Sequence, residues 1–345
     1  MNKDYLTTLK ELKKFANDLP KTRTMAIAKI NTLIKMNMCW EKYQLDKNLK
    51  EHPFKLTNDL VLTAIDDLKA WQSISFCDAG LAVKRQDNAM ESQHHDLFQA
   101  LWVSFNKEQY AERIELYNHR LGVNNLNNDF FYGKKIIDMG CGHGNFAHSM
   151  LGYGASYVLG IDYGEESIDY ANKTLDEFNI PKDRIQFRVE SVYEVQEPDN
   201  SFDFAVQNGV FHHLDDEDKA YKEMHRLLKP DGYAWIYTEG EGSVARDLFH
   251  VSVQILSDIP PDVVQENLRH LGFTINKRYH LGDGLSAVYR ATSFKKLSER
   301  LEKIGFYDFK RQLGGMDTDL DILGDDPWAQ EKFGEGDIRI LMRKR

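Results

Sequence analysis

The sequence predicts an α/β fold in residues 131–345, with a mostly parallel sheet and helices on both of its faces. Short apolar runs alternate there with segments of helical spacing, and this alternation requires a parallel sheet with right-handed crossovers. The first run ends at Asp138 and is followed by glycines at 140, 142 and 144, while the second run ends at another acid, Asp162. This order of strand, glycine turn, helix, strand and acid is typical of the first half of a nucleotide-binding βαβ unit.

Residues 1 to about 130 show helical spacing and no strand pattern, and they predict an N-terminal helical cap for substrate binding or dimerisation. Pro20 separates the first two helices, the polar stretch 40–53 predicts a loop, and Asn58 is expected to cap a third helix. A long amphipathic segment rich in aromatic residues, 97–120, precedes the polar linker 124–129.

The alternating part of the chain predicts five strands before an interruption. The expected strands are 135–139, 157–162, 184–190, 202–207 and 233–238. An insertion with helical pieces then occupies about 240–292, and a helix at 294–304 and two more strands, 306–312 and 337–342, close the sheet. The loop between the last two strands is too short for a usual crossover with its own helix, which predicts an antiparallel last pair.

Composition excludes several classes of protein. The 345 residues carry a net charge of −10 and no long Lys/Arg block, which argues against nucleic acid as the main partner. The three cysteines, Cys39, Cys77 and Cys141, lack metal-ligand spacing and are typical of reduced thiols in the cytoplasm. No signal peptide or membrane-spanning run is indicated, so we expect a cytoplasmic protein without a membrane partner. The acid-rich stretch 316–327 lacks the glycine and final glutamate of an EF-hand, and no metal is expected.

The glycine turn suits an amino-acid cation better than a diphosphate. Glycine allows a tight turn and close approach of a ligand, and the following helix N-terminus favours negative groups such as a carboxylate. Asp138 stands two residues before the first glycine, where a fixed negative charge repels a phosphate but attracts an ammonium or sulfonium. The spacing G-x-G-x-G also differs from the dinucleotide fingerprint G-x-G-x-x-G, which disfavours a nicotinamide oxidoreductase.

The stretch from Asp138 to Gly144 resembles motif I of the class I S-adenosylmethionine-dependent methyltransferases, D-x-G-x-G-x-G. The resemblance covers roughly 130–345 without the insertion, and it implies a Rossmann-like sheet of seven strands and the cofactor S-adenosylmethionine. It also implies that Asp138 faces the cofactor's ammonium and that Asp162, with Tyr163 beside it, faces the ribose. The backbone of Gly140, Cys141, Gly142 and Gly144 then faces the cofactor's carboxylate.

The adenine contact departs from the family pattern. The family has an acid just after the third strand, whereas this sequence has Glu190, Ser191 and Val192. We assign the contact to Ser191 or to the N–H of Val192, with Glu190 as the alternative acid one residue earlier.

The segment after the fourth strand carries the candidate catalytic residue. Its pattern V-F-H-H-L-D-D-E resembles the V-L-H-x-W-x-D-E of small-molecule O-methyltransferases, in which the first histidine is the general base, and that residue is His212 here. An imidazole titrates near neutral pH and can accept a proton from an acceptor hydroxyl or ammonium. Asn208 is assigned to the cofactor site, and Tyr110, His213 and Glu239 are candidate substrate contacts, with Trp102 as a further wall. Each histidine here has a plain structural alternative, as a capping or packing residue.

The predicted function is methyl transfer to a small-molecule acceptor, at nitrogen or oxygen, by direct displacement. Two alternatives stay open: methylation of a protein or RNA, and a cofactor-binding subunit without catalysis that acts through its N-terminal helices. The amphipathic N-terminal helices also make a homodimer a candidate assembly.

Overall fold

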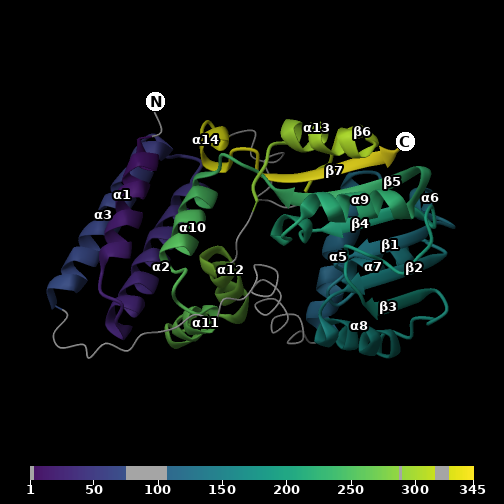
Figure 1. Cartoon of the computed structure of the whole chain (residues 1–345), viewed down its shortest axis with the longest axis horizontal. Coiled ribbons are helices and arrows are strands. Elements are labelled where there is room, and N and C mark those ends of the chain that lie inside the picture. The colour runs from purple at the N-terminus through teal and green to yellow at the C-terminus, as the bar shows by residue number, and fades with distance from the viewer. Residues whose placement is uncertain (1–3, 75–106, 287–289, 315–325) are drawn as a thin grey trace. The chain divides into compact units, whose positions relative to one another are not determined.

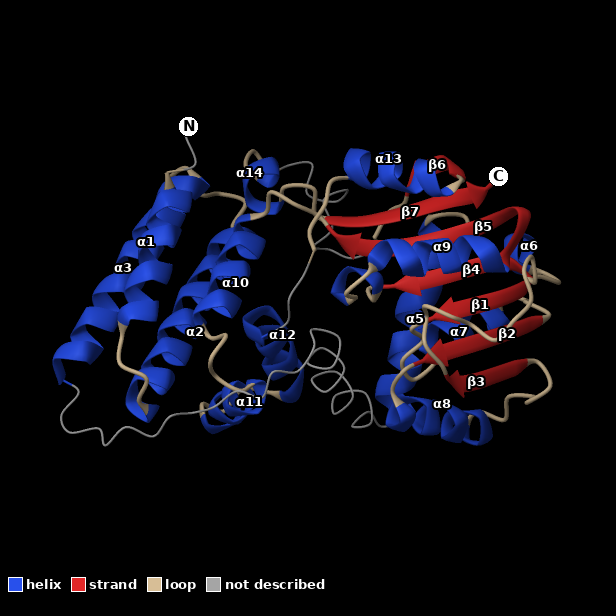
Figure 2. Cartoon of the chain, in the orientation of Figure 1, coloured by secondary structure: helices blue, strands red, loops and turns tan. Residues whose placement is uncertain are grey.

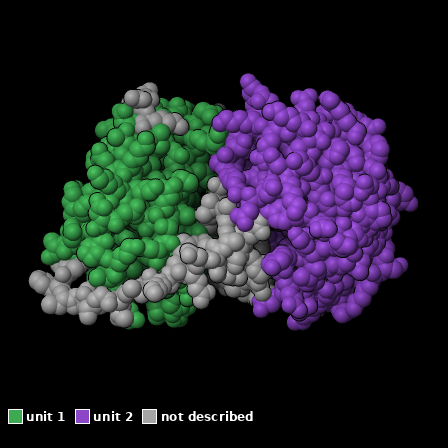
Figure 3. Space-filling view, viewed as in Figure 1, with its two compact units in different colours: residues 1–97, 241–289, 323–336 green, residues 98–240, 290–322, 337–345 purple. Residues whose placement is uncertain are grey.

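The computed structural model describes residues 4–74, 107–286, 290–314 and 326–345. The chain divides into two compact units, drawn green and purple in Figure 3. The helical unit contains residues 1–97, 241–289 and 323–336, and the sheet unit contains 98–240, 290–322 and 337–345. Both units are therefore discontinuous in sequence, and the chain passes between them several times.

The sheet unit is built on seven strands in the order β3-β2-β1-β4-β5-β7-β6 (Figure 2). The first five strands run parallel, and β7 lies antiparallel between β5 and β6. The predicted seven-stranded, mostly parallel sheet and its antiparallel last pair are confirmed. The strands are β1 (Lys135–Met139), β2 (Tyr157–Asp162), β3 (Ile185–Val189), β4 (Phe202–Asn208), β5 (Leu228–Glu239), β6 (Phe306–Arg311) and β7 (Asp337–Lys344).

Helices cover both faces of this sheet because successive strand residues point to opposite faces. Ile137 and its neighbours pack with helices α9 (Glu217–Leu227) and α13 (Phe294–Ile304), while Ile136 packs with the helices of the other face. Those are α5 (Lys107–Val123), the short α6 (Asn128–Phe131), α7 (Asn145–Gly152) and α8 (Glu165–Glu177). The carboxyl ends of β1, β2, β4 and β5 meet at one edge of the sheet (Figure 1), where ligands bind in parallel sheets.

The helical unit joins the N-terminal helices to the insertion. Tyr5 donates a hydrogen bond to Asp247 at 2.7 Å, and the amide of Asn37 donates to the hydroxyl of Ser252 at 3.1 Å. Both contacts link the first helices to a helix of the insertion, so the insertion completes the core of this unit. The helices are α1 (Tyr5–Asp18), α2 (Arg23–Leu45), α3 (Pro53–Ile74), α10 (Val244–Ile255), α11 (Pro261–His270), α12 (Ile275–Ser286) and α14 (Ala329–Phe333).

Two sequence predictions in this unit are wrong at their boundaries. Helix α2 continues through 40–45, a stretch expected to be a loop, because Trp40 is buried in the core of the unit. Helix α3 begins at Pro53 instead of after Asn58, since proline is favoured in the first turn of a helix. Residues 275–286 form α12, which lies inside the predicted insertion 240–292.

The two units do not coincide with the two domains expected on either side of residue 130. Helix α5 belongs to the sheet unit, and the insertion belongs with the N-terminal helices. The roles expected for these parts, in substrate binding or dimerisation, stay predictions. Among the described helices, none is long and apolar enough to cross a membrane.

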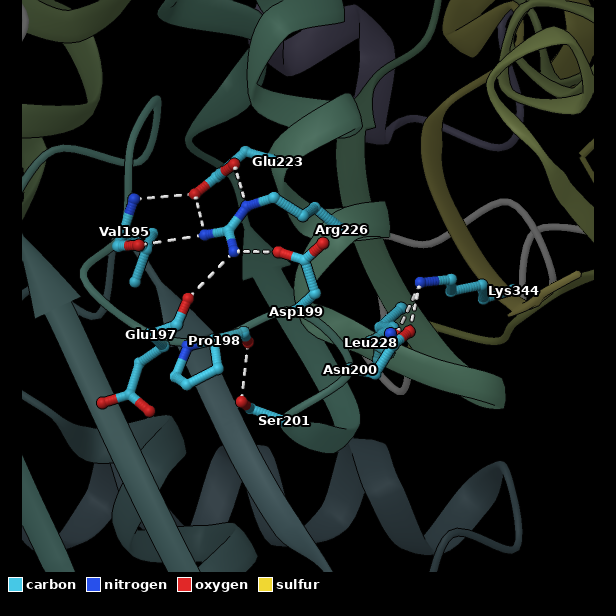
Figure 4. Close-up of polar contacts among 10 residues, drawn as sticks. All are labelled: Val195, Glu197, Pro198, Asp199, Asn200, Ser201, Glu223, Arg226, Leu228 and Lys344. Atoms are coloured by element: carbon cyan, nitrogen blue, oxygen red, sulfur yellow. Dashed lines mark hydrogen bonds and ion pairs between the residues drawn. The ribbon is translucent and has the colours of Figure 1, made fainter.

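An arginine on α9 holds the loop that leads from β3 into β4 (Figure 4). The guanidinium of Arg226 donates to the carbonyls of Val195 and Glu197, both at 2.9 Å, and contacts the carboxylates of Asp199 and Glu223. Glu223 in turn accepts the N–H of Val195 at 2.7 Å. The network fixes the amino end of β4, at the edge of the sheet opposite the carboxyl ends of the strands.

We expect Arg226→Met to lower the free energy of unfolding by about 1–3 kcal/mol, because it removes charged hydrogen bonds to the partly buried carbonyls of Val195 and Glu197 and to the carboxylate of Glu223. Urea denaturation followed by circular dichroism measures this change. Arg269→Met is the matched control, because Arg269 makes an exposed ion pair with Glu266 on α11. Equal stability of the Arg226 variant and the wild type would contradict the structural role of the network.

Candidate functional site

The glycine turn after β1 has the backbone geometry that its sequence requires. Gly140, Gly142 and Gly144 all have positive φ, at 84°, 53° and 87°. A Cβ atom at Gly140 would lie 2.6 Å from Cγ2 of Val210, and one at Gly144 would collide with the ring of Phe187. Side chains are therefore excluded at Gly140 and Gly144 by both backbone conformation and space, and they are disfavoured at Gly142 by its backbone conformation.

The acid at the end of β2 fastens the turn. One carboxylate oxygen of Asp162 accepts the N–H of Gly142 at 2.9 Å, and the other accepts the N–H of Gly164 at 2.8 Å. The N–H groups of Gly140 and Cys141 bond to the carbonyl of Ile161, at 2.8 and 2.9 Å. A carboxylate has about four acceptor positions, so these two N–H bonds are compatible with further donors from a ribose.

Asp138 is the feature that best identifies the ligand. Its side chain is 1% exposed, it accepts the N–H of Ala147 in the first turn of α7, and its Oδ2 atom has no hydrogen-bond partner among the described residues. Burial and then the nearby charge of Asp162 raise the pKa of Asp138 to about 8. A buried carboxyl with an unpaired oxygen is costly alone and suits a cationic group that binds beside it.

The turn therefore fits S-adenosylmethionine by the chemistry of its residues. Asp138 would hold the ammonium and Asp162 would face the ribose hydroxyls. The N–H groups of Gly140, Cys141, Gly142 and Gly144, which were expected to face the carboxylate, are bonded within the protein to Ile161, Asp162 and Cys141. Burial, Asp162 and Asp138 raise the pKa of the Cys141 thiol well above its ordinary value, so Cys141 is a small packing residue in the turn and not a nucleophile.

Tyr110, on α5, contacts residues in and beside the glycine turn. Its side chain is fully buried, and its hydroxyl donates to the carbonyl of His143 at 2.9 Å and lies 3.0 Å from Nδ1 of His148. Burial is the main cause that lowers the pKa of His143 to about 3 and of His148 to about 4, so both imidazoles are neutral. In this structure Tyr110 does not line an open pocket, in contrast to its expected place in a substrate wall.

Of the candidate adenine contacts after β3, Val192 is buried, whereas Glu190 and Ser191 are half-buried. Val192 is buried in the core, and the hydroxyl of Ser191 accepts the N–H of Tyr193 at 3.3 Å. The carboxylate of Glu190 accepts the N–H of Gln196 and pairs with Arg188, so it is engaged on its own side of the loop. Tyr163, the neighbour of Asp162, is 74% exposed.

A second turn, after β4, lies against the glycine turn through the contact of Val210 with Gly140. Asn208 ends β4, and its Oδ1 atom is buried without a hydrogen-bond partner in the described part of the chain. His212 and His213 follow in the short 3₁₀ helix η1 (Phe211–His213), both buried, with ring centroids 4.1 Å apart. The structure thus brings Asn208, His212 and the glycine turn to one edge of the sheet.

Sequence reasoning missed three residues at this edge. Gln207 is fully buried beneath the turn after β4, Tyr237 on β5 has its ring 6.2 Å from His212, and the guanidinium of Arg339 lies 4.8 Å over that ring. Tyr237 and Arg339 are opposite each other in the β5–β7 pair, a register that only the antiparallel closing strand creates. None of the three stands out in the local sequence, because β7 carries other charged residues beside Arg339.

Glu239 ends β5 and is 6% exposed, beside Asp337 in the strand register. It is therefore a buried acid and not a solvated one.

Trp102 and residues 315–325 of the acid-rich stretch lie outside the described residues. Within the described ranges, no group of three or more His, Cys, Asp or Glu side chains could hold a metal ion.

Asp138 predicts a pH dependence of stability. Its folded pKa, about 8, exceeds its ordinary value of 3.8, so the stability that it contributes is present at low pH and is lost as pH rises through 8. We expect Asp138→Asn to remove this loss. Between pH 5 and 8, the free energy of unfolding of the variant should therefore rise relative to that of the wild type, by on the order of a few kcal/mol.

Urea titrations of the ligand-free protein at pH 5 and 8 measure this difference. Asp169→Asn, which removes an exposed carboxyl from α8, controls for the change of net charge. Parallel pH profiles of the wild type and Asp138→Asn would contradict a neutral buried carboxyl.

Comparison with known proteins agrees with this geometry. Residues 137–236 match a family model described as a methyltransferase domain. The chain is similar to the sterol 24-C-methyltransferase erg6 of Aspergillus fumigatus, with 26% identity over 180 residues, 46% of this chain and 45% of that protein. It is also similar to the ubiquinone biosynthesis O-methyltransferase of Neisseria meningitidis, with 35% identity over 107 residues, 31% of this chain and 44% of that protein.

A solved S-adenosylmethionine-dependent methyltransferase from Mesorhizobium loti covers 62% of this chain and 92% of its own, with 20% identity and a TM-score of 0.42. The matched segments span 37% to 61% of the lengths of the first curated relatives. The family match runs from β1 to β5 and includes the glycine turn, so residues 137–236 contain a methyltransferase domain.

Proposed function

We propose that this chain transfers a methyl group from S-adenosylmethionine to a small-molecule acceptor, at nitrogen or oxygen, by direct displacement. The observation that carries the proposal is the buried Asp138, whose unpaired oxygen lies beside a glycine turn that excludes side chains. This combination favours a cationic amino-acid group over a diphosphate.

In this proposal, each part of the cofactor is assigned to particular residues of the chain. Asp138 holds the ammonium, Asp162 holds the ribose, and the backbone of Gly140, Cys141, Gly142 and Gly144 borders the carboxylate. Tyr163, Ser191 or Val192, and Asn208 border the remaining parts of the cofactor. The bound cofactor supplies a methyl group already activated by a sulfonium, so the protein's task is alignment of the acceptor and removal of its proton.

His212 is the proposed general base. It is fixed in η1 next to the turn after β4, and its carbonyl accepts the N–H of Arg290 at 3.2 Å. A base at this edge of the sheet takes the proton of an acceptor hydroxyl or ammonium. His213 and Glu239 are the proposed substrate contacts.

A small-molecule acceptor is supported by the acidic net charge and by two relatives, whose names refer to sterol and ubiquinone chemistry. A protein or RNA acceptor is the alternative, and a catalytically inactive cofactor-binding subunit is another. A cytoplasmic location and a homodimer through the N-terminal helices stay predictions.

Calorimetry tests the cofactor. We expect S-adenosylmethionine to bind and NADH not to, and we expect Asp162→Ala to weaken binding by about 1–3 kcal/mol, because it removes the acceptor of ribose and of the Gly142 N–H. Asp169→Ala, on the exposed face of α8, should bind like the wild type. Preference for NADH, or an Asp162→Ala affinity equal to the wild type, would refute the assignment.

Turnover tests the base. We expect His212→Gln to lower the rate of methyl transfer about 10²- to 10⁴-fold near neutral pH without loss of cofactor affinity, since a positioned base contributes a factor of this size. The acceptor is first found by screening small-molecule pools for methylation with labelled S-adenosylmethionine. His119→Gln, at an exposed position on α5, is the matched control, and undiminished turnover of His212→Gln at every pH would remove His212 as the base.

A further inference from the structure

Gln207 is a buried amide at the junction of three backbone segments. It is the penultimate residue of β4 and is 0% exposed. Its Nε2 donates to the carbonyl of Tyr237 on β5 at 3.0 Å. Its Oε1 accepts the N–H of Val210 at 3.1 Å and the N–H of Phe211 at 3.3 Å.

These bonds help to fix the turn after β4. The turn passes through Gly209 at a φ of +84°, and the N–H of Gly209 also bonds to the carbonyl of Tyr237, at 3.3 Å. Gln207 satisfies the first N–H groups of η1 in the way that a capping side chain does. A buried N–H or carbonyl left without such a partner costs about 1–3 kcal/mol.

The fixed turn carries the candidate catalytic group. His212 follows Phe211 directly, and its carbonyl is held from the other side by the N–H of Arg290. The turn also contacts the cofactor site, through the apolar side chain of Val210 against Gly140, and Gln207 holds the N–H of this same Val210. The amide therefore acts directly on the backbone that leads into His212, and on the glycine turn only through the side-chain packing of Val210.

We propose that Gln207 is a positioning residue, which aligns His212 by bonding η1 and β5 to one amide. The proposal rests on the proposed function, because only methyl transfer gives His212 a task. The position requires glutamine because a single side chain supplies one donor and one acceptor to different segments. Glutamate supplies the acceptor at neutral pH and gains a donor when it is protonated, whereas methionine fills a similar volume and supplies neither.

The experiment compares Gln207→Met and Gln207→Glu with the wild type in the full chain. Histidine ring nitrogens are followed by NMR as a function of pH, with the His212 signals assigned from His212→Gln. Calorimetry with S-adenosylhomocysteine measures the cofactor site separately. Gln186→Met, at an exposed position on β3, is the matched control.

We expect Gln207→Met to shift the His212 ring signals and its titration midpoint while affinity for S-adenosylhomocysteine stays at the wild-type value. We expect Gln207→Glu to show the same shift at high pH and to recover the wild-type signals as pH falls, because the protonated acid can donate to the carbonyl of Tyr237. This recovery keeps the test decisive if the methionine variant does not fold.

Two results would overturn the proposal. One is a His212 titration in both variants that is identical to the wild type. The other is a loss of S-adenosylhomocysteine affinity that accompanies every shift of His212, which would make Gln207 a general support of this edge. A wild type that does not bind S-adenosylhomocysteine would instead refute the proposed function, and the NMR comparison would still decide the role of Gln207.

Discussion

A buried carboxyl at the end of β1 is the constraint on which the site depends. Asp138 contacts the first turn of α7, lies near the acid of β2, and leaves one oxygen without a partner in the described chain. Such a group costs free energy in the ligand-free protein unless it stays protonated. The rest of the edge, including the glycine turn and the Asp162 bonds that fasten it, holds this carboxyl in a fixed place.

The layout of the chain separates the tasks of its two units. The sheet unit contains every residue assigned to the cofactor and the candidate base. After β5 the chain enters the helical unit through 241–289, and before β7 it passes through that unit again, through 323–336. The helical unit has its own core, made from the N-terminal helices and the insertion. Its segments thus depend on one another for folding, although almost 150 residues of sheet unit separate them in sequence.

Local sequence signals predicted the sheet well and the helical unit less well. The first five strands were predictable because each contains a short apolar run that ends near a glycine or an acid, and Asp138, Asp162 and the glycines stand in one continuous motif. Helix ends in the helical unit depend on tertiary burial, as at Trp40, which keeps α2 helical through a polar stretch.

The residues of the glycine motif were predictable because the backbone conformation of the turn requires them. Residues whose role depends on packing between distant segments were not predictable. Tyr110 looked like a substrate contact from its aromatic neighbours, but its hydroxyl serves His143 and His148 inside the fold. Gln207 and Arg339 gave no signal because their importance arises from strand pairing between segments far apart in sequence. Such long-range partners cannot be read from local spacing.

The most direct test of the central claim is a crystal structure of the protein with S-adenosylhomocysteine bound. The account predicts the ligand's ammonium nitrogen within hydrogen-bond distance of Oδ2 of Asp138, with the ribose hydroxyls at Asp162. A ligand seated away from the glycine turn, or an Asp138 oxygen that stays unpaired in the complex, would contradict it.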